Sequence, residues 1–179
     1  MSTRGAIARV KGDGFVGVYH HWDSYPKWLG KTLWELYHGH FKGDLEAMLT
    51  VLIDQHPAGW STINNKDFTK EPGFGAGEQP ECYCHGDRQE EANPVTDKDA
   101  AGIGCEWVYV FNDQKQMLVL ASVNGDGSKM IGMFGQGNPD AKWCIQAIIE
   151  LDGEEPDWEA IKEVTYAKLG RKRPNSVRP

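Results

Sequence analysis

The sequence lacks any uninterrupted run of about 20 apolar residues, which excludes an ordinary membrane-spanning helix. It also lacks the apolar core of a signal peptide, because the stretch 5–10 is short and contains Arg9. Together these absences predict a cytoplasmic protein. Cysteine is scarce, with four residues in 179, and in a reducing compartment these are expected to be thiols or metal ligands rather than disulfides.

Positively charged residues are also fewer than negatively charged ones. The chain has 19 Lys and Arg against 26 Asp and Glu, for a net charge of −7. Four of the positive residues lie in the tail 171–179, so the remaining body is more acidic still. An acidic body repels phosphate backbones, which makes duplex nucleic acid an unlikely partner and leaves a small-molecule ligand or a protein partner.

Several catalytic motifs are absent. There is no G-x-S-x-G nucleophile elbow and no H-E-x-x-H zinc motif, and the glycine run 73–77 does not follow a strand pattern as a dinucleotide loop requires. The sequence therefore assigns no enzyme class, and whether the protein is an enzyme stays open.

The patterns that are present predict an α+β domain over 1–170, followed by a basic flexible tail over 171–179. Extended patterns at 3–10 and 15–22, and again at 106–111 and 117–123, indicate hairpins. Further strands are expected at 129–134 and 143–151. Helical periodicity appears at 28–38, at 45–53 after Asp44, and from Pro156 to Gly170. We expect an antiparallel sheet built from hairpins, with three helices packed on it and a long central loop.

That long loop, residues 60–103, shows no lasting helix or strand period. Loops of this length inside a compact domain are usually lids, disordered segments or segments held by a ligand. Cys82, Cys84 and His85 lie near its middle, and Cys105 follows it. Three thiols and an imidazole suit tetrahedral zinc, although the one-residue gap between Cys82 and Cys84 is shorter than the usual spacing. We therefore predict a zinc site made by these four residues.

A second candidate site follows the second strand, in the segment 18–26. An imidazole beside a carboxylate is the ordinary arrangement for a general base, and His20, His21 and Asp23 are the candidates. Neighbouring residues on a strand point to opposite faces, so one histidine is expected in the core and the other at the surface.

Four residues are expected to bind a ligand at this second site. Arg4, on the paired strand, would hold an anionic group by its guanidinium. Aromatic rings stack bases well, and they are expected to contribute binding surface here. The aromatic candidates are Trp22, Tyr25 and Trp60.

Segments of the chain resemble a family of uncharacterised bacterial and phage proteins. The resemblance rests on the patterns R-G-A-I-A-R at 4–9, G-V-Y-H-H-W-D-S-Y-P at 17–26 and L-G-x-x-L at 29–33. It continues at G-W-S (59–61), C-Y-C (82–84), G-C-E-W-V-Y-V (104–110) and E-P-D-W (155–158). It implies a small accessory protein in a bacterial or phage-infected cell, with a role in host–phage conflict, and it implies no activity.

The residues support three hypotheses. The first is a binding protein for a nucleotide-like or other anionic small molecule, with hydrolysis by a His/Asp site as the simplest reaction. The second is a non-catalytic protein that sequesters a signalling molecule or binds a protein partner through its acidic surface. The third is a zinc-stabilised module whose histidines only pack.

Overall fold

The predicted N-terminal hairpin lies at the centre of the sheet. In the computed structural model, which describes residues 3–64, 68, 80–122 and 143–161, β1 (Gly5–Lys11) pairs antiparallel with β2 (Gly14–His20). The hairpin register places Gly5 opposite His20 and Lys11 opposite Gly14. The end of β2, where the candidate histidines lie, is therefore held beside the start of β1.

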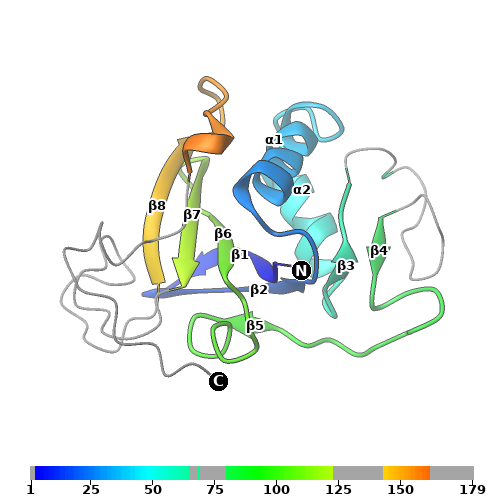
Figure 1. Cartoon of the computed structure of the whole chain (residues 1–179). Coiled ribbons are helices and arrows are strands. Elements are labelled where there is room, and N and C mark those ends of the chain that lie inside the picture. The colour runs from blue at the N-terminus through cyan, green and yellow to red at the C-terminus, as the bar shows by residue number, and fades with distance from the viewer. Residues whose placement is uncertain (1–2, 65–67, 69–79, 123–142, 162–179) are drawn as a thin grey trace, which may run out of the picture.

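In the described residues, six further strands complete the sheet. They are β3 (Trp60–Thr62), β4 (Glu81–Cys82), β5 (Val95–Thr96), β6 (Trp107–Phe111), β7 (Gln116–Ser122) and β8 (Trp143–Glu150). The strand order is β4-β3-β2-β1-β6-β7-β8, and β5 pairs with β2 (Figure 1). The second predicted hairpin, β6 with β7, and the strand expected at 143–151 are present.

The expectation of an antiparallel sheet is wrong at two pairings. β1 runs parallel to β6, and β2 runs parallel to β3 at the pair His20 and Trp60. Between β2 and β3 the chain crosses over through the helices, which returns it to the sheet in the same direction. Hairpin signals are local, so they gave no indication of these two long-range pairings. The fold is an α+β arrangement on a mixed sheet.

Within the described ranges, two α-helices cover one face of the sheet (Figure 1). α1 (Lys31–His38) continues a π-helical turn over Pro26–Gly30, and α2 (Leu45–Leu49) runs into another over Thr50–Asp54. The Asp44 carboxylate accepts a hydrogen bond from the Ala47 backbone N–H at 3.0 Å, which caps α2 as predicted.

The third predicted helix needs correction. In the described part of the chain after Pro156 there is only a 3-10 turn, Trp158–Ala160, and the rest of the expected helix lies outside the described residues. No helix in the described ranges is long and apolar enough to span a bilayer. The glycine run 73–77, the expected strand 129–134 and the basic tail also lie outside the described residues.

Successive side chains along the strands point to opposite faces of the sheet, so the buried residues form two core clusters, one on each face. On the helix-covered face, Ile7 and Val18 pack with Leu33 and Leu52 from the helical segment. On the opposite face, Ala6 and Phe15 pack with Val95 of β5 and with Ala100 of the segment that follows it. Both faces of the central strands are therefore covered, which explains why β6 is buried along its whole length.

The prediction of a long structureless loop over 60–103 is wrong in its described parts. β3 and β4 form an antiparallel pair at one edge of the sheet, and β5 pairs with β2. These strands have only two or three residues each, too few to show a two-residue period in the sequence. This edge carries two of the cysteines that the sequence singled out, Cys82 and Cys84.

Candidate metal centre

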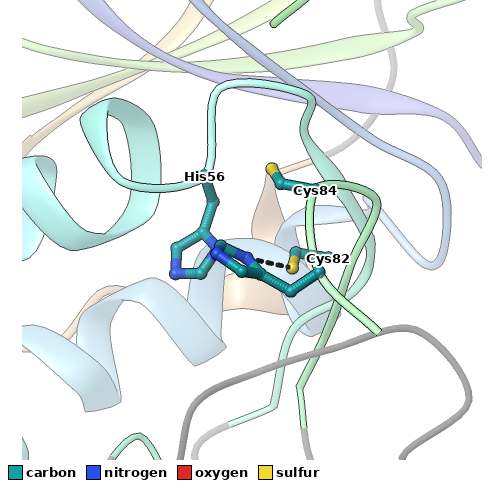
Figure 2. Close-up of side chains that lie close together, drawn as sticks. His56, Cys82 and Cys84 are labelled. Carbon is teal, nitrogen blue, oxygen red and sulfur yellow. Dashed lines mark hydrogen bonds between the residues drawn. The ribbon is translucent and has the colours of Figure 1, made fainter. Parts of the chain in front are cut away.

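Four potential metal ligands meet beside β3 and β4. They are His56, Cys82, Cys84 and His85, and one ligand atom from each lies within 4.8 Å of all the others. Figure 2 shows the sulfur atoms of both cysteines pointing toward the side on which His56 lies. This cluster could hold a metal ion such as zinc.

The local backbone explains why these side chains converge. Cys82 is the last residue of β4 and lies opposite Trp60 of β3, which brings it back beside the turn that precedes β3. The Tyr83 backbone N–H then donates to the Gly59 carbonyl at 3.0 Å. Gly59 has a φ of 91°, and a Cβ there would lie 2.6 Å from the Tyr19 carbonyl, so only glycine fits. The turn with His56 is thereby held against the cysteine segment.

His56 shows a clear sign of a missing partner. Its side chain is buried, and its Nδ1 has no hydrogen-bond partner among the described residues. Burial, with a smaller contribution from His85, lowers the pKa of His56 to about 4. The ring is therefore neutral near pH 7, the state in which imidazole ligates a metal. A buried polar nitrogen without a partner is unfavourable unless something absent from the chain satisfies it.

The spacing of the cluster suits a tetrahedral ion. Zn–S and Zn–N bonds of ordinary length place neighbouring ligand atoms about 3.3–3.8 Å apart. The Cys82 Sγ lies 3.3 Å from His85 Nδ1, within that range (dashed line in Figure 2). The widest separation in the cluster, up to 4.8 Å, is longer by about 1 Å, a difference that side-chain rotation can close.

The two sulfurs have different surroundings. Burial raises the pKa of Cys82, since the thiolate loses solvation in the core. A divalent cation reverses this preference and binds the thiolate form. The Cys84 Sγ accepts a hydrogen bond from the Ala58 backbone N–H at 3.3 Å, which fixes the position of that sulfur beside the turn with His56.

The predicted ligand set is therefore corrected at one position, with His56 in place of Cys105. Cys105 packs in the core on the opposite face of the sheet, and its thiol donates to the Gly5 carbonyl at 3.3 Å. Burial raises its pKa to about 12, so it stays a thiol. Sequence reasoning missed His56 because it lies 26 positions before Cys82, in a turn that looked only like a helix stop.

The structure does not make His20 available as a general base. His20 is fully buried, its Nε2 accepts the Ile63 backbone N–H at 3.3 Å, and its Nδ1 lies 2.8 Å from Ser24 Oγ. Because Nε2 accepts, the proton of the neutral ring is on Nδ1, which donates to Ser24. Burial first, and His21 second, lowers the pKa of His20 to about 3. Both nitrogens serve the fold, contrary to the catalytic role expected.

His21 points to the other face of the sheet, as strand alternation predicts. It is half-buried, and its Nδ1 lies 2.8 Å from the Tyr19 hydroxyl. Asp23 does not join either imidazole in the described contacts, because its carboxylate accepts the Thr3 backbone N–H at 2.7 Å. The predicted His/Asp pair is thus separated into a surface histidine and a turn-forming aspartate.

The expected ligand-binding residues are dispersed. Arg4 is exposed and precedes β1, and the Trp22 side chain is 52% exposed, whereas Tyr25 packs partly against the core. Trp60 is wrong as a stacking platform, since it is fully buried. Its Nε1–H donates to the Leu52 carbonyl at 2.8 Å.

Trp60 instead supports the metal cluster. Its ring lies against the His56 imidazole, with the ring centroids 4.5 Å apart. The His56 ring also meets the His85 ring at 5.0 Å, edge to face. These contacts fix the orientation of the buried histidine before any ion binds.

Comparisons of the chain with protein-family models, with curated proteins and with solved structures return no match. The geometry of the cluster is therefore what indicates a function for this chain.

Proposed function

We propose that this protein binds one zinc ion through His56, Cys82, Cys84 and His85, and that the ion stabilises the edge of the sheet. The observation that carries the proposal is the buried Nδ1 of His56, which has no partner among the described residues and belongs to a cluster of four ligands. Two sulfurs and two imidazoles are the ligands that zinc prefers, whereas magnesium and calcium select oxygen.

A structural role fits this ligand set better than a catalytic one. Catalytic zinc sites usually have three protein ligands and keep a fourth position open for water or substrate. Here four side chains are available, enough to complete a tetrahedral set around one ion, and two of them, His56 and Cys82, are buried. The ion would join the turn before β3 to the end of β4 and so close the intervening chain into a loop. Such a link stabilises the fold by limiting the unfolded chain.

Mass spectrometry tests the proposal directly. Native spectra of freshly purified protein should show the mass of one zinc ion per chain, and the ion should be absent under denaturing conditions. Cys82→Ser should lose the ion. Cys105→Ser is the matched control, because it removes a buried thiol outside the cluster and should keep one zinc. An absence of zinc, or its retention by Cys82→Ser, would overturn the proposal.

A second candidate function is the binding of a small anionic ligand at the surface beside His21. Burial raises the pKa of the Tyr19 hydroxyl, and the positive charge of Arg4, just before β1, opposes that rise. The Tyr19 hydroxyl lies 2.8 Å from His21 Nδ1, and when it donates there His21 presents Nε2–H as a donor, with Arg4 as the cation near Tyr19. This arrangement supports recognition of a phosphate or carboxylate group.

Titration with inorganic phosphate, followed by the imidazole NMR signals, tests this second candidate. Phosphate should shift the His21 resonances and leave those of exposed His40 unchanged. An unchanged His21 signal at millimolar phosphate would refute the candidate. Hydrolysis by this site, and recognition of a protein partner by the acidic surface, stay predictions.

A further inference from the structure

Cys82 and Cys84 differ in their access to solvent. Cys82 is fully buried, whereas Cys84, two residues later, is partly exposed. Both sulfurs nonetheless belong to one cluster whose ligand atoms lie within 4.8 Å of each other. An exposed thiol beside a buried one is the arrangement in which the first reacts with an oxidant and the second resolves the product.

We propose that Cys84 is a site of oxidation by hydroperoxides, and that its reaction with Cys82 forms a disulfide and releases the zinc ion. This inference rests on the proposed zinc-binding function and adds a means of regulating it. The partly exposed Cys84 sulfur is the first to meet a solute, because Cys82 is fully buried.

The chemistry balances with hydrogen peroxide as the oxidant. The Cys84 thiolate attacks one peroxide oxygen, so an S–O bond forms, the O–O bond breaks, and hydroxide leaves and takes up a proton to become water. The Cys82 thiolate then attacks the Cys84 sulfur, the S–S bond forms, and the second oxygen leaves as hydroxide, which also becomes water. Two electrons pass from the sulfurs to the peroxide, and zinc stays divalent.

The backbone permits the disulfide with a modest change. Residues two apart on an extended strand have Cα atoms about 6.6 Å apart, near the upper end of the usual disulfide range. β4 ends at Cys82 and the chain bends over the next residues, which allows a shorter approach than an extended strand does. Tyr83 between them is anchored separately, by its backbone bond to Gly59 and by stacking on Tyr19.

Loss of two thiolates would leave only His56 and His85 as ligands. Two imidazoles hold zinc far more weakly than a complete set of four ligands, so the disulfide should release the ion. A thiol reductant would restore both sulfurs and with them the site. The reversible product is a disulfide rather than an overoxidised acid because the resolving thiol is already adjacent.

The test uses the reduced, zinc-loaded full chain, whose zinc content is measured first. About one equivalent of hydrogen peroxide should release the zinc to a chromogenic chelator and lower the denatured mass by about 2 Da, the two hydrogens of a disulfide. Dithiothreitol with added zinc should reverse both changes. Peptide mapping should place the bond between Cys82 and Cys84.

Single variants identify which sulfur reacts first. In Cys82→Ser, a sulfenic acid should accumulate on Cys84 and be trapped by dimedone; in Cys84→Ser, trapping at Cys82 should be at least about tenfold slower. Both variants lose one zinc ligand, so this comparison does not depend on zinc retention. Cys144→Ser is the control that keeps the cluster and should behave as the parent protein.

The outcomes separate the two proposals. A reduced chain without zinc overturns the proposed function, and this inference with it. A chain that holds one zinc but keeps it after peroxide treatment overturns the inference alone. Trapping first at Cys82, or a disulfide that includes Cys105 or Cys144, also overturns it.

Discussion

Protonation of His20 should make the fold sensitive to acid. Burial lowers the pKa of His20 to about 3 in the folded protein, against about 6.5 in an unfolded chain. Above pH 6.5 neither state binds the proton, and the contribution of neutral His20 to stability is complete. As the pH falls from 6.5 toward 3, the unfolded chain gains a proton that the folded chain cannot accept, so the free energy of unfolding decreases.

The size of the effect follows from the two pKa values. Each pH unit between them is worth about 1.4 kcal/mol, and the linkage relation gives a loss of about 2 kcal/mol between pH 7 and pH 5. Burial is the main physical cause of the lowered pKa, followed by the charge of His21. The Ile63 N–H also points at Nε2 and leaves no room for a second proton there. The ring would have to leave its site to be protonated.

Urea unfolding at pH 7 and pH 5 measures this loss in the parent protein and in His20→Gln. Glutamine is uncharged at both values and can both accept and donate, so the variant should lose about 2 kcal/mol less between the two conditions. The metal cluster is present in both proteins, and its own pH dependence cancels in the difference. His40→Gln reports the effect of removing an exposed imidazole. Equal losses in the parent and His20→Gln would refute the reasoning.

Two further substitutions test the sheet and the support of the metal cluster. Gly17→Ala would place a Cβ 1.9 Å from the Ile7 carbonyl oxygen. We therefore expect denaturation assays to show that the free energy of unfolding falls by more than about 3 kcal/mol, or solubility assays to show insoluble protein. A free energy of unfolding within about 1 kcal/mol of the parent would contradict this packing. Trp60→Phe removes the buried hydrogen bond to the Leu52 carbonyl and should cost about 1–3 kcal/mol, while native mass spectra still show one zinc. Unchanged stability in urea unfolding would show that this hydrogen bond contributes nothing net.

Local signals in the sequence predicted local features correctly. The turn at 11–14 and the alternation around it indicate the hairpin of β1 and β2, and the Asp44 cap indicates the start of α2. Alternation also predicted that His20 and His21 face opposite sides of the sheet. Each of these features depends on residues within a few positions of one another, so a short segment of sequence is enough to predict it.

The long-range pairings and the complete metal cluster depend on tertiary structure. The parallel pairing of β1 with β6 joins segments about 100 residues apart, and no hairpin signal records it. Cys82, Cys84 and His85 were recognisable as candidate metal ligands from their chemistry and proximity. The fourth member was not, because Cys105 is nearer in sequence and His56 lies in a turn that gave no ligand signal; only the pairing of β3 with β4 brings His56 to the cluster.

The residues themselves set which chemistry the chain can offer: thiols and imidazoles in a short segment, an excess of acidic residues and amphipathic elements. The packing of the folded chain sets how each group is used. It buried His20 between Ser24 and Ile63, where desolvation keeps the ring neutral, and it placed the His56 imidazole beside two sulfurs. The physical reason is that ligation and desolvation depend on distances of a few ångströms between residues far apart in the chain, and these distances are set by the packing of the whole sheet.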